Sequence, residues 1–87
     1  MKFKDIYFSK TGFFSIGIEE ISGNYYISIP VSNRLVDYEE YYKLDKNIYD
    51  KYSDSLDDLI FIAEECRQRL RDDDLFIKPG SDRGVPR

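Results

Sequence analysis

Residues 13–31 read FFSIGIEEISGNYYISIPV, which is two alternating runs separated by a turn. From Phe14 to Ile18 an apolar residue occupies every second position, and residues 25–31 alternate in the same way. Successive side chains of a β-strand point to opposite faces, so both runs predict strands with one apolar face. Residues 22–24 are Ser-Gly-Asn, which predicts a tight turn. We therefore expect an antiparallel hairpin here.

The flanking segments extend this sheet on both sides. Lys2 to Phe8 predicts a strand, joined to the hairpin by a turn over residues 9–12. Leu35 to Leu44 fits a helical period as well as a period of two, in which Glu40 interrupts the apolar face. We choose a strand because its tyrosines favour an extended backbone. Pro30 has no amide hydrogen, so its end of the strand is expected at an edge or a termination.

Two helices are expected after the strands. Asp45 can cap a short helix over Lys46 to Tyr52. Ser55 can cap a longer one, whose apolar residues recur at spacings of three and four up to Leu70. The predicted fold is α+β: an antiparallel meander sheet of about four strands, with one main C-terminal helix and a short helix packed on one face.

The length of 87 residues indicates one domain. We assign residues 1–78 to this α+β domain and residues 79–87, rich in turn-forming residues, to a flexible C-terminal tail. The short apolar patch Leu75 to Ile77 is expected either to add a strand or to pack under the helix.

Negative charge is concentrated in residues 37–74. This part of the chain carries thirteen carboxylates and six basic side chains, a local net charge of 6 − 13 = −7, with five tyrosines among them. Acidic groups attract a basic partner, and tyrosines offer rigid contact area. The whole chain has a net charge of −4, which argues against direct binding of nucleic acid. We therefore expect a protein that binds a basic protein.

The fourth predicted strand and the start of the main helix supply the candidate contacts. The strand alternation directs Asp37, Glu39 and Tyr41 away from the helix layer. Water alone could satisfy this face, but carboxylates at the helix start add to it, so Asp57 and Asp58 are secondary candidates. These five residues are the predicted partner-binding site.

No catalytic or metal-binding pattern competes with this interpretation. Histidine is absent, and Cys66 falls on the apolar side of the predicted helix, where an inert thiol is expected. No segment resembles a calcium loop. We expect no enzymatic activity, no catalytic residue, no metal and no cofactor. The single cysteine favours a reducing compartment, and no apolar stretch indicates a signal sequence or membrane span, so the cytoplasm is expected.

Residues 29–42, IPVSNRLVDYEEYY, and residues 79–84, PGSDRG, give the chain a resemblance to small bacterial immunity proteins. These proteins are encoded beside toxins of polymorphic or contact-dependent growth inhibition systems. The resemblance implies a cytoplasmic inhibitor that binds the toxin domain of its own system. Together with the acidic surface, it suggests a basic nuclease as the partner. The alternative is a small structural or regulatory protein that forms homo-oligomers through a sheet edge or the tyrosine face.

Overall fold

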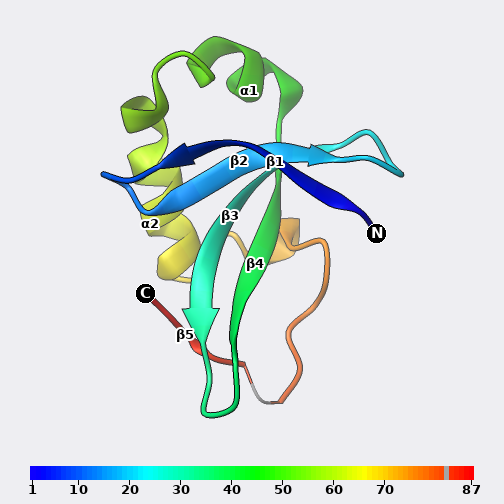
Figure 1. The fold of residues 1–87 in the computed structure, drawn as a ribbon, viewed down its shortest axis with the longest axis vertical. Coiled ribbons are helices and arrows are strands. Elements are labelled where there is room, and N and C mark those ends of the chain that lie inside the picture. The colour runs from blue at the N-terminus through cyan, green and yellow to red at the C-terminus, as the bar shows by residue number, and fades with distance from the viewer. Residues whose placement is uncertain (82) are drawn as a thin grey trace.

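The computed structural model describes residues 1–81 and 83–87. Its antiparallel strands follow the order β1-β2-β3-β4, and a short β5 pairs with β3 (Figure 1). The strand bounds are Phe3–Ser9, Phe14–Glu19, Tyr25–Ser32, Asp37–Leu44 and Val85–Pro86. The α+β class and the meander are therefore confirmed, and the ambiguous fourth segment is a strand.

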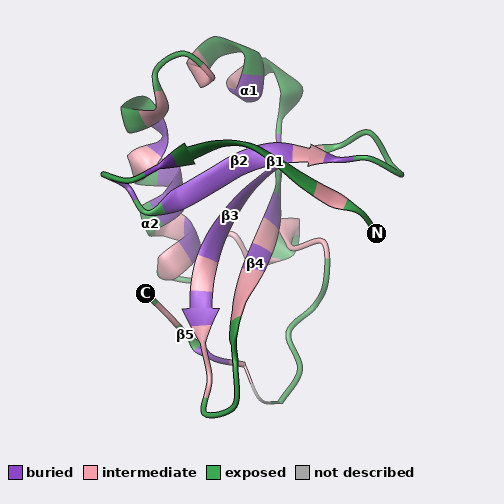
Figure 2. Ribbon diagram, viewed as in Figure 1, coloured by how far each residue is buried: buried purple, intermediate pink, exposed green. Residues whose placement is uncertain are grey.

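One face of the sheet forms the hydrophobic core. Ile16, Ile27 and Tyr42 lie opposite one another across β2, β3 and β4, and all three are fully buried. The helix α2, Ile60–Arg67, packs against β3 and buries Ile62, Ala63 and Cys66 (Figure 2). Each fully buried Leu, Ile or Phe side chain contributes about 1.5–3 kcal/mol, so this two-layer contact supplies most of the driving force for folding.

Pro30 lies inside β3, where β2 no longer accompanies it. The β2 pairing ends at Ser28, and Pro30 accepts a hydrogen bond from the backbone N–H of Arg87 at 3.1 Å. The missing donor of Pro30 therefore faces the side of β3 that β2 has left and that the C-terminal segment covers, so Pro30 lies beyond the end of the β2 pairing but not at a free edge.

The short helix α1, Lys46–Tyr52, has the expected bounds. The side chain of Asp45 accepts a hydrogen bond from the N–H of Asn47 at 2.8 Å, so the predicted cap is present. A carboxylate at this position satisfies an N–H group that has no partner inside the helix.

The main helix begins differently from the prediction. Residues Leu56–Leu59 form a 3₁₀ turn, η1, before α2, and Ser55 makes no side-chain capping bond. The N–H of Asp58 instead bonds to the carbonyl of Ser55 at 2.9 Å, which closes the tighter turn. The expected cap at Ser55 is therefore wrong, since backbone bonding replaces it.

The helix also ends earlier than the apolar pattern predicts. Arg69 has φ 62, and the N–H of Leu70 bonds to the carbonyl of Glu65 at 2.9 Å. This left-handed residue and the backward bond form a Schellman termination, with an arginine where glycine is usual. Leu70 is consequently 66% exposed and does not belong to the buried stripe. A second 3₁₀ turn, η2, covers Asp72–Asp74.

The end of the chain lies against the sheet. Val85 and Pro86 pair with Ser32 and Val31 of β3, and Gly84 is buried. A Cβ atom on Gly84 would lie 2.4 Å from the carbonyl oxygen of Ser32, so only glycine allows this approach. Residues 83–87 thus pack on the domain, where we expected a flexible tail, and Asp82 lies outside the described residues.

Glu19 stabilises the turn between β2 and β3. Its side chain is almost fully buried and accepts hydrogen bonds from the backbone N–H groups of Lys2, Ile21 and Ser22 at 2.7–3.0 Å. These bonds, with that from Lys2 the strongest, lower the pKa of Glu19 to about 2.

This lowered pKa predicts an acid-sensitive contribution to folding. The folded pKa lies below the unfolded one, so the stabilisation is present above about pH 4.5 and is lost as the pH falls toward 2. We expect Glu19→Gln to reduce the free energy of unfolding in urea at pH 7, and the difference from the native chain to shrink at pH 2. The exposed neighbour Glu20 gives the control, Glu20→Gln. An equal deficit for Glu19→Gln at both pH values would contradict this account.

Candidate protein-binding face

The two faces of β4 have different surroundings. Tyr38, Glu40, Tyr42 and Leu44 oppose the core side chains of β3, whereas Asp37, Glu39, Tyr41 and Lys43 lie on the other face. This alternation was predicted. The structure therefore brings Asp37, Glu39 and Tyr41 onto one face of one strand, away from α2.

Asp37 is exposed and already has a cationic partner. Its Oδ1 atom lies 2.8 Å from the Arg87 guanidinium and accepts a hydrogen bond from the Ser32 hydroxyl. Exposed ion pairs of this kind contribute about 0–1 kcal/mol, so an incoming cation can replace Arg87 at little cost.

Glu39 is a partly buried carboxylate without an ion pair in the part of the chain that the structure describes. Its one side-chain hydrogen bond comes from the Ser28 hydroxyl at 3.2 Å. Burial raises the pKa of Glu39, the Ser28 bond opposes this rise, and the nearby charge of Asp5 adds to it. The ionised form of Glu39 is therefore less favourable here than it would be beside a cation.

Tyr41 is held within an aromatic cluster that we define as Phe3, Tyr26, Tyr41 and Phe76. Its ring stacks on Phe3 with centroids 3.7 Å apart and meets Tyr26 edge to face at 5.0 Å. Tyr26 is fully buried and donates its hydroxyl hydrogen to Asp5 at 2.5 Å. The sequence suggested that Tyr41 is available for contact with a partner. In the structure part of its ring packs on Phe3 and Tyr26 instead.

Asp57 and Asp58 lie elsewhere. Both are exposed in η1, which leads into α2 in the helix layer, and neither has a side-chain ion pair among the described residues. Asp37, Glu39 and Tyr41 face the opposite side of the sheet. The structure therefore separates these two secondary candidates from the other three.

A partly buried charge cluster on the helix-facing side of β4 was not predicted. Arg83 lies 2.8 Å from Glu40 and 2.7 Å from Asp72, and the Tyr42 hydroxyl donates to Glu40 at 2.7 Å. Arg83 lowers the pKa of the Asp72 carboxyl through its hydrogen bond. The signal in the sequence was Glu40 itself, because a carboxylate inside an apolar row requires a partner.

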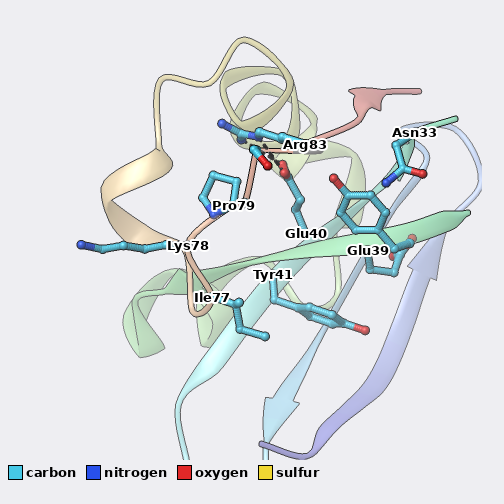
Figure 3. A pocket seen from close by; sticks show the side chains of 11 residues that line it. Asn33, Glu39, Glu40, Tyr41, Ile77, Lys78, Pro79 and Arg83 are labelled. Atoms are coloured by element: carbon cyan, nitrogen blue, oxygen red, sulfur yellow. Dashed lines mark hydrogen bonds and ion pairs between the residues drawn. The ribbon is translucent and has the colours of Figure 1, made fainter. Parts of the chain in front are cut away.

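A hollow of about 430 Å³ opens beside the edge of β4. It is lined by Tyr38 to Tyr41 of β4 and by residues 77–81, together with Asn33 and Arg83 (Figure 3). Because its lining includes consecutive strand residues, the hollow reaches both faces of β4 at the strand edge.

The described residues hold no group of three or more histidine, cysteine or acidic side chains arranged for a metal ion. Cys66 is buried, and desolvation is the main reason that its pKa rises to about 12, so its thiol is protonated at neutral pH. Among the described helices, none has the length and apolar character that a membrane crossing requires.

Comparisons with protein-family models, with curated proteins and with solved structures find no match for this chain.

The largely buried pair of Arg83 and Glu40 predicts a large effect of Arg83→Met on stability. Glu40 is 6% exposed, and its charge would remain without a cation. Removing one partner of a buried pair costs about 3–5 kcal/mol, which urea unfolding measures. Adding Glu40→Gln to Arg83→Met should restore much of this loss, since no buried charge remains.

Arg87→Met is the matched control for Arg83→Met. It removes an arginine from an exposed pair with Asp37, so we expect a loss of no more than about 1 kcal/mol. Equal losses for the two arginine variants would show that the Arg83 cluster is not energetically distinct.

Proposed function

We propose that this chain is an immunity protein, a non-catalytic inhibitor that binds and neutralises the toxin domain of its own system. The partner in this proposal is a basic nuclease domain. The contact face is the side of β4 that carries Asp37, Glu39 and Tyr41.

The observation that carries the proposal is the environment of Glu39. A partly buried carboxylate loses hydration, and among the described residues one hydroxyl group, that of Ser28, compensates for that loss. A lysine or arginine from a partner would restore a favourable environment for the charge. A basic surface therefore suits this position better than water does.

Two further observations support the same face. Asp37 stands beside an exposed cation that a partner can displace, and the Tyr41 ring is packed in place by stacking on Phe3. Ordered contact residues reduce the entropy lost on binding. Asp57 and Asp58 lie in the helix layer, so the proposal now gives them no direct contact.

The function is tested by purifying the tagged chain from lysate of its native host at low salt and eluting at high salt. We expect one basic protein at stoichiometric amount, identified by mass spectrometry. Its nuclease activity should fall to background when an equimolar amount of the chain is added. Recovery of the chain alone, or a captured protein whose activity is unaffected, would refute the proposal.

The role of Glu39 predicts a pH-dependent affinity for that partner. A cation beside Glu39 lowers its pKa in the complex, whereas burial raises the pKa of this carboxyl in the free chain. Binding therefore favours the ionised form, and affinity should increase as the pH rises through the raised pKa of the free chain. Glu39→Gln should weaken binding at pH 7 and flatten this dependence in calorimetric titrations.

The double variant Asp57→Asn/Asp58→Asn is the matched control, because it removes two carboxylates outside the proposed face. We expect this variant to retain the pH dependence of the affinity. Any change in its association rate should follow from its less negative net charge. If this control weakens the complex more than Glu39→Gln does, the proposed face is wrong.

Self-association is a second candidate function, and one observation favours it. The edge strand β1 exposes Ile6, Tyr7 and Phe8, each between 43% and 51%. An exposed apolar edge can pair with a second copy, although the irregular register between Asp5 and Tyr7 opposes regular pairing. Sedimentation equilibrium separates the two functions, since a mass that increases with concentration favours self-association.

A further inference from the structure

The outer edge of β4 is covered along part of its length. β4 is the last strand of the sheet path, with β3 on its inner side. On the outer side Leu75 forms a bridge with Tyr42, and the N–H of Phe76 bonds to the Tyr41 carbonyl at 3.0 Å. This contact shows that the main-chain groups of Tyr41 are directed outward.

The main-chain groups of Glu39 and Asp37 are directed outward in the same way. In an antiparallel pair, alternate residues turn their N–H and C=O groups to the same side, and Glu39 is two residues from Tyr41. Among the described residues, no backbone group outside the β3–β4 ladder bonds to the main chain of Glu39 or Asp37. This part of the edge therefore has donors and acceptors available for another strand.

The hollow beside β4 gives an extended chain room at this edge. Its volume of about 430 Å³ lies in the range of about 300–1,000 Å³ typical of binding pockets. In Figure 3 Ile77 lies beside Tyr41 and Pro79 lies near Arg83, and both contribute apolar surface to the lining of the hollow. A strand placed about 4.8 Å from the outer edge of β4 would occupy this hollow.

The charges at this edge favour a basic occupant. The Glu39 carboxylate has no cation among the described residues, and Arg83 is balanced by Glu40 and Asp72. Lys78 also lines the hollow, but its side chain extends away from Glu39 in Figure 3. A second copy of β4 fits poorly, because antiparallel pairing centred on Glu39 would place two carboxylates opposite each other.

We propose that β4 receives an extended basic segment of the partner by strand addition. The incoming segment hydrogen-bonds to the main chain of Asp37 and Glu39 and places a lysine or arginine against the Glu39 carboxylate. This inference rests on the proposed function and adds the mode by which the partner is bound.

The probe for this edge is a blocked peptide of alternating lysine and valine, titrated into the full-length chain and followed by amide NMR. We expect the Asp37 and Glu39 amides to shift and to exchange more slowly with solvent. A peptide with glutamate in place of lysine, and one with proline in place of valine, should bind at least about tenfold more weakly. Equal binding of the proline peptide would overturn strand addition, since that peptide cannot form the ladder.

A backbone substitution tests the hydrogen bonds directly. Chemical ligation at Cys66 allows a full chain in which the Glu39 nitrogen carries a methyl group and the side chain is unchanged. We expect this variant to bind the lysine-valine peptide at least about tenfold more weakly. N-methylation of Thr11, in the exposed β1–β2 turn, is the control, and amide spectra verify that both variants fold.

The outcomes separate this inference from the proposed function. Undiminished peptide binding by the N-methyl-Glu39 chain, together with intact toxin neutralisation, overturns strand addition and leaves the function. If the peptide binds at Asp37 and Glu39 but no toxin is found that the chain neutralises, strand addition at the edge of β4 is supported and the proposed function is refuted. Peptide shifts concentrated at Asp57 and Asp58 would overturn the assignment of this edge.

Discussion

Arg83 lies between the Glu40 and Asp72 carboxylates, at 2.8 Å and 2.7 Å, and the position of the C-terminal segment depends on these contacts. The side chain of Arg83 is 12% exposed, so its charge is stabilised by the two acids and hardly by water. The next residue, Gly84, donates its N–H to the Tyr38 hydroxyl at 2.7 Å. These bonds join β4, η2 and the end of the chain, which are distant in sequence.

The same contacts shape the proposed binding edge. Leu75 and Phe76 bond to β4 before the hollow begins, and Arg83 attaches the chain to β4 again after it. Residues 77–81 therefore span between two attachment points and form the outer wall. Arg83 therefore takes part both in the ion cluster with Glu40 and Asp72 and in the lining of the hollow beside Glu39.

The two faces of β4 differ in how their polar groups are satisfied. On the core side, Glu40 has a guanidinium and the Tyr42 hydroxyl. On the opposite side, Tyr41 packs in the aromatic cluster, whereas the described residues give the Glu39 side chain a single hydrogen bond, from the Ser28 hydroxyl. Because buried charges need compensation, this difference singles out Glu39 as the position where a partner has most to add.

Much of the fold could be predicted because its signals are local. The alternation from Phe14 to Ile18 is a property of adjacent residues, and so is the capping of α1 by Asp45. The end of α2 was missed because Arg69 adopts a left-handed conformation that its side chain does not favour. The apolar pattern up to Leu70 could not reveal this termination.

The candidate site was predictable in part for the same reason. A period of two was sufficient to place Asp37, Glu39 and Tyr41 on one face of β4. It was not sufficient to exclude Asp57 and Asp58, whose position relative to β4 depends on how η1 and α2 pack. The stacking of Tyr41 on Phe3 joins residues of β4 and β1, the last and first strands of the sheet path. The alternation within one strand contains no such information.

The sequence by itself determined which residues share a face of β2, β3 and β4, where most turns fall and that residues 37–74 carry excess negative charge. These properties follow from backbone periodicity and composition. Only the tertiary structure decided which carboxylates have cationic partners. Glu40 pairs with Arg83, which is 43 residues away in the sequence. Glu39 is next to Glu40 in the sequence but lies on the other face of β4. Ion pairing depends on distance in space, and that distance exists only once the chain has folded.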